Sequence, residues 1–235
     1  MVTIENLHKS FGKNHVLRGV DLTINQGGIF AVLGPNGSGK TTLIKSILGM
    51  VLPDKGTITV FNENIKKNPT YRHKIDYLPQ IANFPSNLKV HELITMIKDL
   101  RQPTTEDQRL IDLFKLQPFL DKKLGNLSGG TKQKVNIVLT FMFNSPLIIL
   151  DEPTTGLDPI SLIRLKALIQ DEKAKGKTIL ITSHIMSFVE EISNEIVFLL
   201  EGDIYFKGSI QELKTKTKQH DFEHAIASIL TNNHA

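Results

Sequence analysis

Apolar and polar positions along this chain follow two different periods, one typical of strands and the other of helices. Residues 2–24 alternate with a period of two on either side of a Phe11–Asn14 turn, which predicts a β-hairpin. Residues 29–33 form an unbroken apolar run, typical of a buried strand. Similar short runs predict strands at residues 57–61, 75–78, 147–150, 178–182, 196–200 and 204–206.

Helical spacing dominates the middle of the chain. Val90, Leu93, Ile94 and Ile97 recur at helical intervals, so residues 88–124 are expected to form a helical insertion. Further helices are expected at residues 131–143, 159–175, 185–193, 209–217 and 221–230. Strands that alternate with helices predict an α/β fold with a largely parallel sheet, in which ligands bind at the carboxyl ends of the strands.

A glycine-rich turn, Gly34–Gly39, separates the first apolar run from a helix that starts at Lys40. Gly34, Gly39, Lys40 and Thr41 meet the G-x-x-x-x-G-K-[ST] pattern in its strand–loop–helix setting. Glycines let consecutive N–H groups surround a phosphate, and the helix N-terminus adds positive potential. Lys40 would reach the β- and γ-phosphates, and Thr41 would hold Mg²⁺. A plain turn is the alternative, but this context favours nucleoside-triphosphate binding. The expected phosphate-binding residues are Gly34, Asn36, Gly37, Ser38, Gly39, Lys40, Thr41 and Thr42.

Two acidic residues, Asp151 and Glu152, directly follow the apolar run at residues 147–150. In a phosphate-loop protein, an aspartate at this place holds Mg²⁺, directly or through water. The adjacent Glu152 can accept a proton from an attacking water molecule. An acidic residue after a strand can also cap the next helix, but the phosphate loop favours metal binding and base catalysis.

A second turn, Leu127-Ser128-Gly129-Gly130, opens the helix expected at residues 131–143. Its serine hydroxyl, its glycines and the helix N-terminus suit the same anion chemistry as the first loop. A serine at this position is also an ordinary helix N-cap. The residues of this turn by themselves are compatible with both interpretations.

Composition narrows the classes of function. The chain has 28 basic and 24 acidic residues, a net charge of +4 and a pI of about 9.1, and its basic residues are scattered, so a nucleic-acid partner is not expected. It contains no cysteine, which excludes disulfides and cysteine-ligated zinc. It shows neither an apolar run that would span a bilayer nor the apolar core of a signal peptide. We therefore expect a cytosolic protein.

The motifs follow one another in a characteristic order: the phosphate loop, Gln80, the LSGG turn, the Asp151–Glu152 strand end, Gly156-Leu157-Asp158 and His184. In this order they resemble the ATP-binding cassette (ABC) ATPases along the whole chain. The resemblance implies a P-loop α/β fold with a RecA-like parallel-sheet core, an N-terminal antiparallel β-subdomain and an inserted α-helical subdomain. It also implies a single domain over residues 1–235. The core would comprise residues 1–87 and 145–220, the helical lobe residues 88–144, and a short tail residues 221–235.

The resemblance implies which residues bind the base and the metal ion. Phe11 would stack on adenine, although the family more often has a tyrosine, and Val16 would pack against the same base. Gln80 would contact Mg²⁺ and the attacking water, in a loop that faces a membrane partner. Asp151 would associate with Mg²⁺ together with Thr41.

The resemblance also implies which residues act in catalysis and between subunits. Glu152 would be the catalytic base, and His184 the switch histidine near the γ-phosphate. Ser128–Gly130 would clamp the γ-phosphate, although Thr131 stands where the family usually has a glutamine. Asp158 would lie in the loop that crosses between protomers.

One phosphate loop and one LSGG turn per chain imply a dimer. If ATP lies between the loop of one subunit and the turn of another, a single copy cannot complete a site. The resemblance thus implies a dimer that encloses two ATP·Mg²⁺. The expected function is the ATP-hydrolysing subunit of a membrane transporter, whose polytopic permease subunits are separate chains. Such a subunit would lie on the cytoplasmic face of the inner or plasma membrane.

Two narrower resemblances concern the type of transporter. Residues 221–226 resemble the tail of exporter-type (ABC-2-like) ATPases, and Tyr77–Gln80 with the following lobe resembles the ATPases of copper-related transporters that serve nitrous-oxide reductase maturation. The alternative is a non-transport ABC ATPase that acts on ribosomes or DNA, but those proteins tend to carry two cassettes, coiled-coil insertions or zinc modules, and none is present here. A phosphate-loop kinase would explain neither the LSGG turn nor His184.

A pair of histidines near the end of the chain is a further candidate site. His220 and His224 have i, i+4 spacing on a predicted helix, beside Asp221. Histidines at this spacing can bind a metal ion. Histidines beside acidic residues near a chain end are also common without any ligand.

Overall fold

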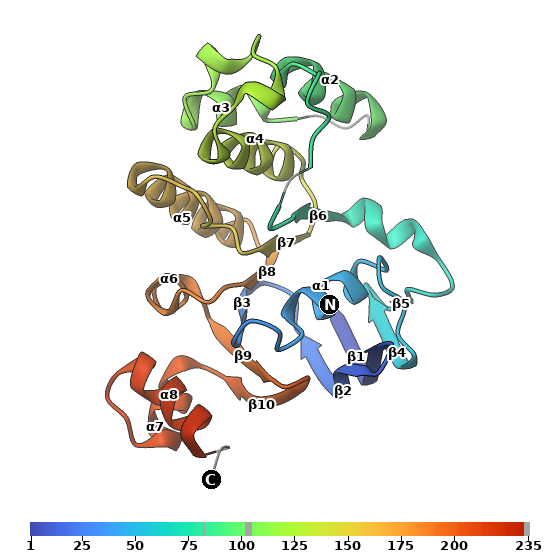
Figure 1. Ribbon diagram of the computed structural model, residues 1–235, viewed down its shortest axis with the longest axis vertical. Coiled ribbons are helices and arrows are strands. Elements are labelled where there is room, and N and C mark those ends of the chain that lie inside the picture. The colour runs from blue at the N-terminus through green and yellow to red at the C-terminus, as the bar shows by residue number, and fades with distance from the viewer. Residues whose placement is uncertain (82, 102–104, 233–235) are drawn as a thin grey trace.

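Two β-sheets and several groups of helices make up the protein (Figure 1). The computed structural model describes residues 1–81, 83–101 and 105–232. The strands of this part of the chain form one four-stranded and one six-stranded sheet. The expected α/β class is therefore confirmed.

The four-stranded sheet is antiparallel and contains the predicted N-terminal hairpin. Phe11 pairs with Asn14 across the turn, so the expected turn is confirmed. The strand order is β2-β1-β4-β5, and the two-residue strand β5 is an addition that no apolar run indicated. The strands are β1 (Val2–Phe11), β2 (Asn14–Ile24), β4 (Lys55–Val60) and β5 (Glu63–Asn64).

The six-stranded sheet has the order β10-β9-β3-β8-β7-β6 and is parallel except for the antiparallel pair of β9 and β10. This confirms the largely parallel sheet expected from the sequence. Because neighbouring parallel strands end at the same edge, the residues that follow β3, β6, β7 and β8 gather there. The strands are β3 (Gly28–Leu33), β6 (Ile75–Leu78), β7 (Leu147–Asp151), β8 (Thr178–Thr182), β9 (Glu195–Leu200) and β10 (Asp203–Gly208).

The helices of the middle segment, α2, α3 and α4, lie together on one side of the sheets, at the top of Figure 1. We call residues 88–144, which contain them, the helical lobe. In the described residues no helix is both long and apolar enough to cross a bilayer. The α-helices are α1 (Lys40–Ile47), α2 (Val90–Arg101), α3 (Asp107–Leu113), α4 (Gly129–Phe141), α5 (Pro159–Ala174), α6 (Met186–Ile192), α7 (Ile210–Thr217) and α8 (Phe222–Asn232). The 3₁₀ helices are η1 (Pro69–Lys74), η2 (Gln117–Phe119) and η3 (Leu124–Asn126).

Strand β3 is buried on both faces, which explains its unbroken apolar run. Ile29, Ala31 and Leu33 belong to the hydrophobic core that includes residues of α4, α5 and α6. Phe30 and Val32 point the other way, into a core shared with α1 and the antiparallel sheet. A parallel strand covered on both sides needs no polar positions. The phosphate loop therefore starts from a rigid central strand.

The histidine pair near the end of the chain does not lie on one helix. Helix α8 begins at Phe222, so His220 precedes it, and Nδ1 of His224 lies 3.1 Å from Oδ1 of Asp221. Within the described ranges, no group of three or more His, Cys, Asp or Glu side chains is placed to hold a metal ion. The premise of a helical i, i+4 pair is therefore wrong. Residues 233–235 of the predicted tail lie outside the described residues.

Candidate functional site

The loop between β3 and α1 passes very close to its neighbours. A Cβ on Gly34 would collide with the carbonyl oxygen of Leu199 on β9. Gly39 has φ 107°, in the left-handed region that glycine adopts readily, and is the N-cap of α1. No side chain caps this helix, so its first amide groups lack a side-chain acceptor. A helix N-terminus of this kind is well suited to bind an anion.

Lys40 begins α1, and its side chain folds back over the loop. Only 7% of the residue is exposed, and Nζ donates to the carbonyl oxygens of Gly34 (2.7 Å) and Pro35 (3.1 Å). Burial lowers the pKa of Lys40, while the carboxylates of Glu152 and Asp151 act in the opposite direction. The ammonium group is partly removed from water, which strengthens its attraction for an anion.

Ser38 gives an independent indication that the loop is built for a ligand. The residue is 3% exposed, and its Oγ has no hydrogen-bond partner among the described residues. Leaving a buried hydroxyl unpaired costs about 1–3 kcal/mol. Because folded proteins pair nearly all such groups, a ligand oxygen that accepts this hydrogen bond fits the loop.

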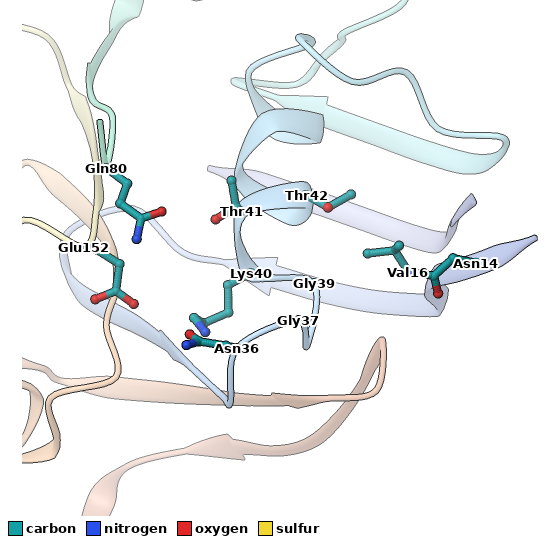
Figure 2. Close-up of a pocket in the computed structure, with 10 residues that line it drawn as sticks. All are labelled: Asn14, Val16, Asn36, Gly37, Gly39, Lys40, Thr41, Thr42, Gln80 and Glu152. Carbon is teal, nitrogen blue, oxygen red and sulfur yellow. The ribbon is translucent and has the colours of Figure 1, made fainter. Parts of the chain in front are cut away.

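A cavity of about 450 Å³ lies between this loop and the residues that follow β6 and β7. In Figure 2, Gln80 and Glu152 face Lys40 on one side of the loop, while Val16 and Asn14 lie on the other. The volume of this cavity is typical of a site for a small molecule. The residues that line it are Asn14, Val16, Asn36, Gly37, Gly39, Lys40, Thr41, Thr42, Gln80 and Glu152.

The two acidic residues at the end of β7 have different environments. Asp151 is 1% exposed, and its Oδ1 accepts a hydrogen bond from Oγ1 of Thr182 on β8. Glu152 has φ 50°, a conformation that is uncommon outside glycine and often found at functional sites. Its Oε2 lies 2.8 Å from Nδ1 of His184. The fold thus brings His184, from the end of the next strand, to the glutamate that lines the cavity.

Some of the predicted site residues do not line the cavity. Phe11 lies at the end of β1, is 51% exposed, and has Nζ of Lys9 at 5.3 Å from its ring centre. Ser128 is the N-cap of α4, and its Oγ accepts a hydrogen bond from the amide of Thr131 at 3.3 Å. A Cβ on Gly129 would meet no atom within 4 Å. Ser128 of the LSGG turn therefore caps its helix, as one of the two interpretations predicts, and Gly129 faces open space.

Asp158 lies beside the LSGG turn of the same chain. It caps α5 by accepting hydrogen bonds from the amide (2.9 Å) and hydroxyl (2.8 Å) of Ser161, and Nζ of Lys134 lies 2.7 Å from its Oδ2. The Lys134 ammonium and the Ser161 donors hold the pKa of Asp158 well below its usual value. A Cβ on Gly130 would come within 2.6 Å of the carbonyl oxygen of Gly156. The start of α4 and the loop before α5 are therefore packed tightly together.

Asn14 lines the cavity although no sequence pattern assigned it to the site. It begins β2, opposite Phe11. Asparagine is common in turns, so the Phe11–Asn14 turn already explained why an asparagine stands at this position. Its position two residues before Val16 was the available signal, because alternate residues of a strand face the same side.

Known proteins identify the family to which this arrangement belongs. The model of the family described as ABC transporter matches residues 17–155, which include the phosphate loop, Gln80, the LSGG turn and both acidic residues. The chain belongs to the ABC transporter family. The expected resemblance is therefore confirmed.

The relatives of this ABC protein cover nearly all of it. It is 33% identical over 222 residues to the lipopolysaccharide export system ATP-binding protein LptB of Haemophilus influenzae. The aligned part covers 91% of this chain and 92% of LptB. It is 32% identical over 207 residues to the Nod factor export ATP-binding protein I of Burkholderia lata, with coverage of 86% and 68%.

A solved structure of the ATP-binding subunit of an ABC transporter superposes with a TM-score of 0.91 at 28% identity, over 98% of this chain and 99% of that one. This agreement confirms the expected P-loop α/β fold. The ABC protein is an ATP-binding subunit that hydrolyses ATP to drive transport.

Proposed function

We propose that two copies of this ABC protein enclose two ATP molecules, each held in the cavity of one copy and covered by the LSGG turn of the other. The supporting observation is that the predicted site is divided. The phosphate loop, Gln80 and Glu152 share one cavity, whereas Ser128–Gly130 do not line it. Open space at Gly129 leaves room for a ligand at the turn. A second copy related by twofold symmetry would supply the missing turn to both sites.

The phosphates would lie at the end of the cavity that contains Lys40. Its ammonium group would exchange the carbonyl oxygens of Gly34 and Pro35 for phosphate oxygens and gain stronger, charge-assisted hydrogen bonds. The hydroxyl of Ser38 would find its missing acceptor in the same place. The amide groups at the start of α1, which no side chain caps, would add further donors.

The adenine base would lie at the opposite end, beside Val16 and Asn14. Val16 offers apolar surface there, and Asn14 offers a polar side chain. Phe11 pairs with Asn14 in the hairpin and is exposed, so its ring would be available to the base from the turn beside the cavity. An aromatic ring stacks favourably on a planar base.

Glu152 would act as the general base toward the water that attacks the γ-phosphate. ATP and water would become ADP and phosphate, and the carboxylate would take the proton that the water loses. His184 would donate from Nδ1 to Oε2 and leave the other carboxylate oxygen for the water. Gln80, which faces the same end of the cavity in Figure 2, would orient this water.

Thr41, Gln80 and Asp151 would hold Mg²⁺ when it arrives with the phosphates. Hydroxyl, amide and carboxylate oxygens are the ligands that Mg²⁺ prefers, and the ion usually shares its site with phosphates and water. Such a shared site fits this chain, because Thr41 and Gln80 line the same cavity as Lys40, and the Asp151 carboxylate acts electrostatically on Lys40. The bound ion would neutralise negative charge on the phosphates.

The dimer would drive a membrane permease made of separate chains. LptB and the Nod factor export protein both belong to export systems, which supports an exporter-type (ABC-2-like) transporter. We infer that the dimer is bound at the cytoplasmic face of the inner or plasma membrane. The copper-related resemblance stays a prediction.

A mixing experiment tests the shared site. Lys40→Ala disables the phosphate loop, and Gly129→Glu blocks the LSGG turn without a clash inside the chain, since a Cβ there meets nothing within 4 Å. Neither variant alone should hydrolyse ATP. An equimolar mixture should regain activity, because one site of the mixed dimer combines an intact loop with an intact turn.

The control for this experiment mixes Lys40→Ala with Glu152→Gln. Both substitutions affect the cavity of their own copy, so neither site of the mixed dimer is intact and no activity should return. Failure of the first mixture to hydrolyse ATP, under conditions in which the unmodified chain is active, would contradict the shared site.

A further inference from the structure

An ion pair joins the helical lobe to the first half of β6, whereas Gln80 follows the other end of this strand. Arg101, the last residue of α2, pairs through Nη1 with Oδ1 of Asp76, the second residue of β6. The side chain of Asp76 is 1% exposed. Its other oxygen accepts a hydrogen bond from the amide of Ser145 at 3.3 Å. A carboxylate this deeply buried requires such partners.

The guanidinium group of Arg101 contacts two other segments of the chain, residues 73–76 and 143–145. Besides Asp76, it donates from Nη2 to the carbonyl oxygen of His73 (3.2 Å), just before β6, and to Oγ of Ser145 (3.1 Å), just after the lobe. Its central carbon lies 4.1 Å from the ring centre of Phe143, within the range of a cation–π interaction. Arg101 therefore joins α2 to the start of β6 and to the segment that leads into β7.

Two polar contacts connect the lobe to the other end of β6. Nδ2 of Asn136 donates to the carbonyl oxygen of Pro79 (3.1 Å). Oγ1 of Thr140 lies 3.4 Å from the carbonyl oxygen of Tyr77, a weaker contact, because its one proton also reaches the carbonyl oxygen of Asn136 (2.9 Å). Both donors lie on α4 and both are buried. Because Pro79 immediately precedes Gln80, the segment that leads to Gln80 is attached to the lobe both at Asp76 and at Pro79.

We propose that Asp76 and Arg101 are positioning residues for Gln80: their ion pair fixes the orientation of the helical lobe on β6, and α4 and β6 carry this orientation to the Gln80 amide. The inference rests on the role of Gln80 in the proposed function. The other ion pair between the lobe and the rest of the described chain joins Lys134 to Asp158, whose side chain is 47% exposed. Since water competes less with a buried pair, the Asp76–Arg101 pair is the stiffer connection.

The test removes this ion pair without leaving a charge buried. Asp76→Asn combined with Arg101→Met, which we call the anchor variant, deletes both charges, because either substitution alone would leave the partner's charge unpaired. The control variant is Lys98→Met with Asp107→Asn. Lys98 lies one turn earlier on α2, and its ion pair with Asp107 (3.0 Å) stays inside the lobe. Arg101→Lys is a milder second variant, which keeps the charge but loses the planar set of donors.

The orientation of the lobe is measured in the absence of nucleotide. The chain has no cysteine, so spin labels at Asp121→Cys on the lobe and Ala174→Cys at the end of α5, both exposed positions, report a single distance. We expect a wider distance distribution in the anchor variant, a smaller widening in Arg101→Lys, and the parent distribution in the control variant. A parent distribution in both the anchor variant and Arg101→Lys would overturn the proposal.

ATP hydrolysis separates positioning from general destabilisation. We expect kcat of the anchor variant to fall about 10- to 100-fold, since a misplacement of about 1 Å has effects of this size. ATP affinity should stay at the parent value, because the phosphate loop is unchanged. An unchanged kcat together with a widened distribution would overturn the role of the pair in positioning Gln80. If the parent failed to bind ATP, the proposed function would be refuted, while the distances measured without nucleotide would still decide whether the pair orients the lobe.

Discussion

Two turns of this ABC protein have similar composition, yet the serine hydroxyl is buried and unpaired in one and exposed and hydrogen-bonded in the other. Each combines serine and glycine and leads into a helix, the phosphate loop into α1 and the LSGG turn into α4. In the phosphate loop, the buried hydroxyl of Ser38 has no partner among the described residues, and no side chain caps the helix. In the LSGG turn, Ser128 is exposed and caps its own helix.

This difference supports the proposal that the phosphate loop binds its ligand within a single chain. A buried donor without an acceptor gains stability as soon as a phosphate oxygen reaches it. An exposed turn that already satisfies its own helix gains little until another surface covers it. The contrast therefore supports the proposal that the LSGG turn depends on a second copy.

The largest expected effect concerns the cavity of the phosphate loop. Glu152→Gln removes the charge but keeps the shape, so ATP turnover should fall about 10²- to 10⁴-fold while ATP still binds. Phosphate release measures the rate, and gel filtration with ATP should show a trapped dimer. Glu201→Gln is the control, because Glu201 has the same left-handed backbone (φ 49°) between β9 and β10 and does not line the cavity. A turnover close to that of the parent would show that Glu152 is not the base.

A smaller effect is expected on ATP affinity. Lys40→Ala removes the ammonium group that faces the phosphates, and hydrogen bonds to a charged group of this kind account for about a 10- to 100-fold change in affinity. Calorimetric titration with ATP measures the loss. Lys45→Ala is the matched control, because Lys45 lies on the exposed side of the same helix. Equal affinities in the two variants would remove Lys40 from the phosphate site.

The smallest effect is expected at the LSGG turn. Ser128→Ala removes the cap of α4 and should lower the free energy of unfolding by about 1 kcal/mol. Ser209→Ala removes the comparable cap of α7, where Oγ accepts from the Glu212 amide at 3.1 Å, and should cost about as much. Urea unfolding compares the two losses. ATP turnover should fall in addition only for Ser128→Ala, so parent turnover in both variants would reduce the turn to a helix cap.

Local patterns predicted most helices and strands of the fold, because residues close together in the sequence largely determine secondary structure. The hairpin turn at Phe11–Asn14 and the strand at residues 178–182 were both expected and are both present. Strand β5 has two residues, and Tyr71 is the one buried residue of helix η1. Both were missed because neither contains an apolar run or period. His220 was predicted to lie on the last helix, but this helix begins after it, at Phe222. The Asp221 carboxylate accepts a hydrogen bond from the His224 amide and so caps the first turn.

Contacts between distant parts of the chain could not be predicted in this way. The short distance from His184 to Glu152 depends on β7 and β8 being neighbours in the sheet. The burial of Asp76 against Arg101 depends on how α2 returns to the start of β6. No local period records either arrangement, because the partners are separated by many residues and meet only in the folded chain.

By itself, the sequence determined the phosphate loop, the acidic strand end and the LSGG turn, because each depends on residue types at fixed short spacing. Only the tertiary structure decided which of them lie together. Strands β3, β6 and β7 end at one edge of a parallel sheet, so the loop, Gln80 and Glu152 share a cavity. The LSGG turn sits at the start of α4 in the helical lobe and is not part of that lining. Each chain therefore contains both parts of the proposed site but does not bring them together.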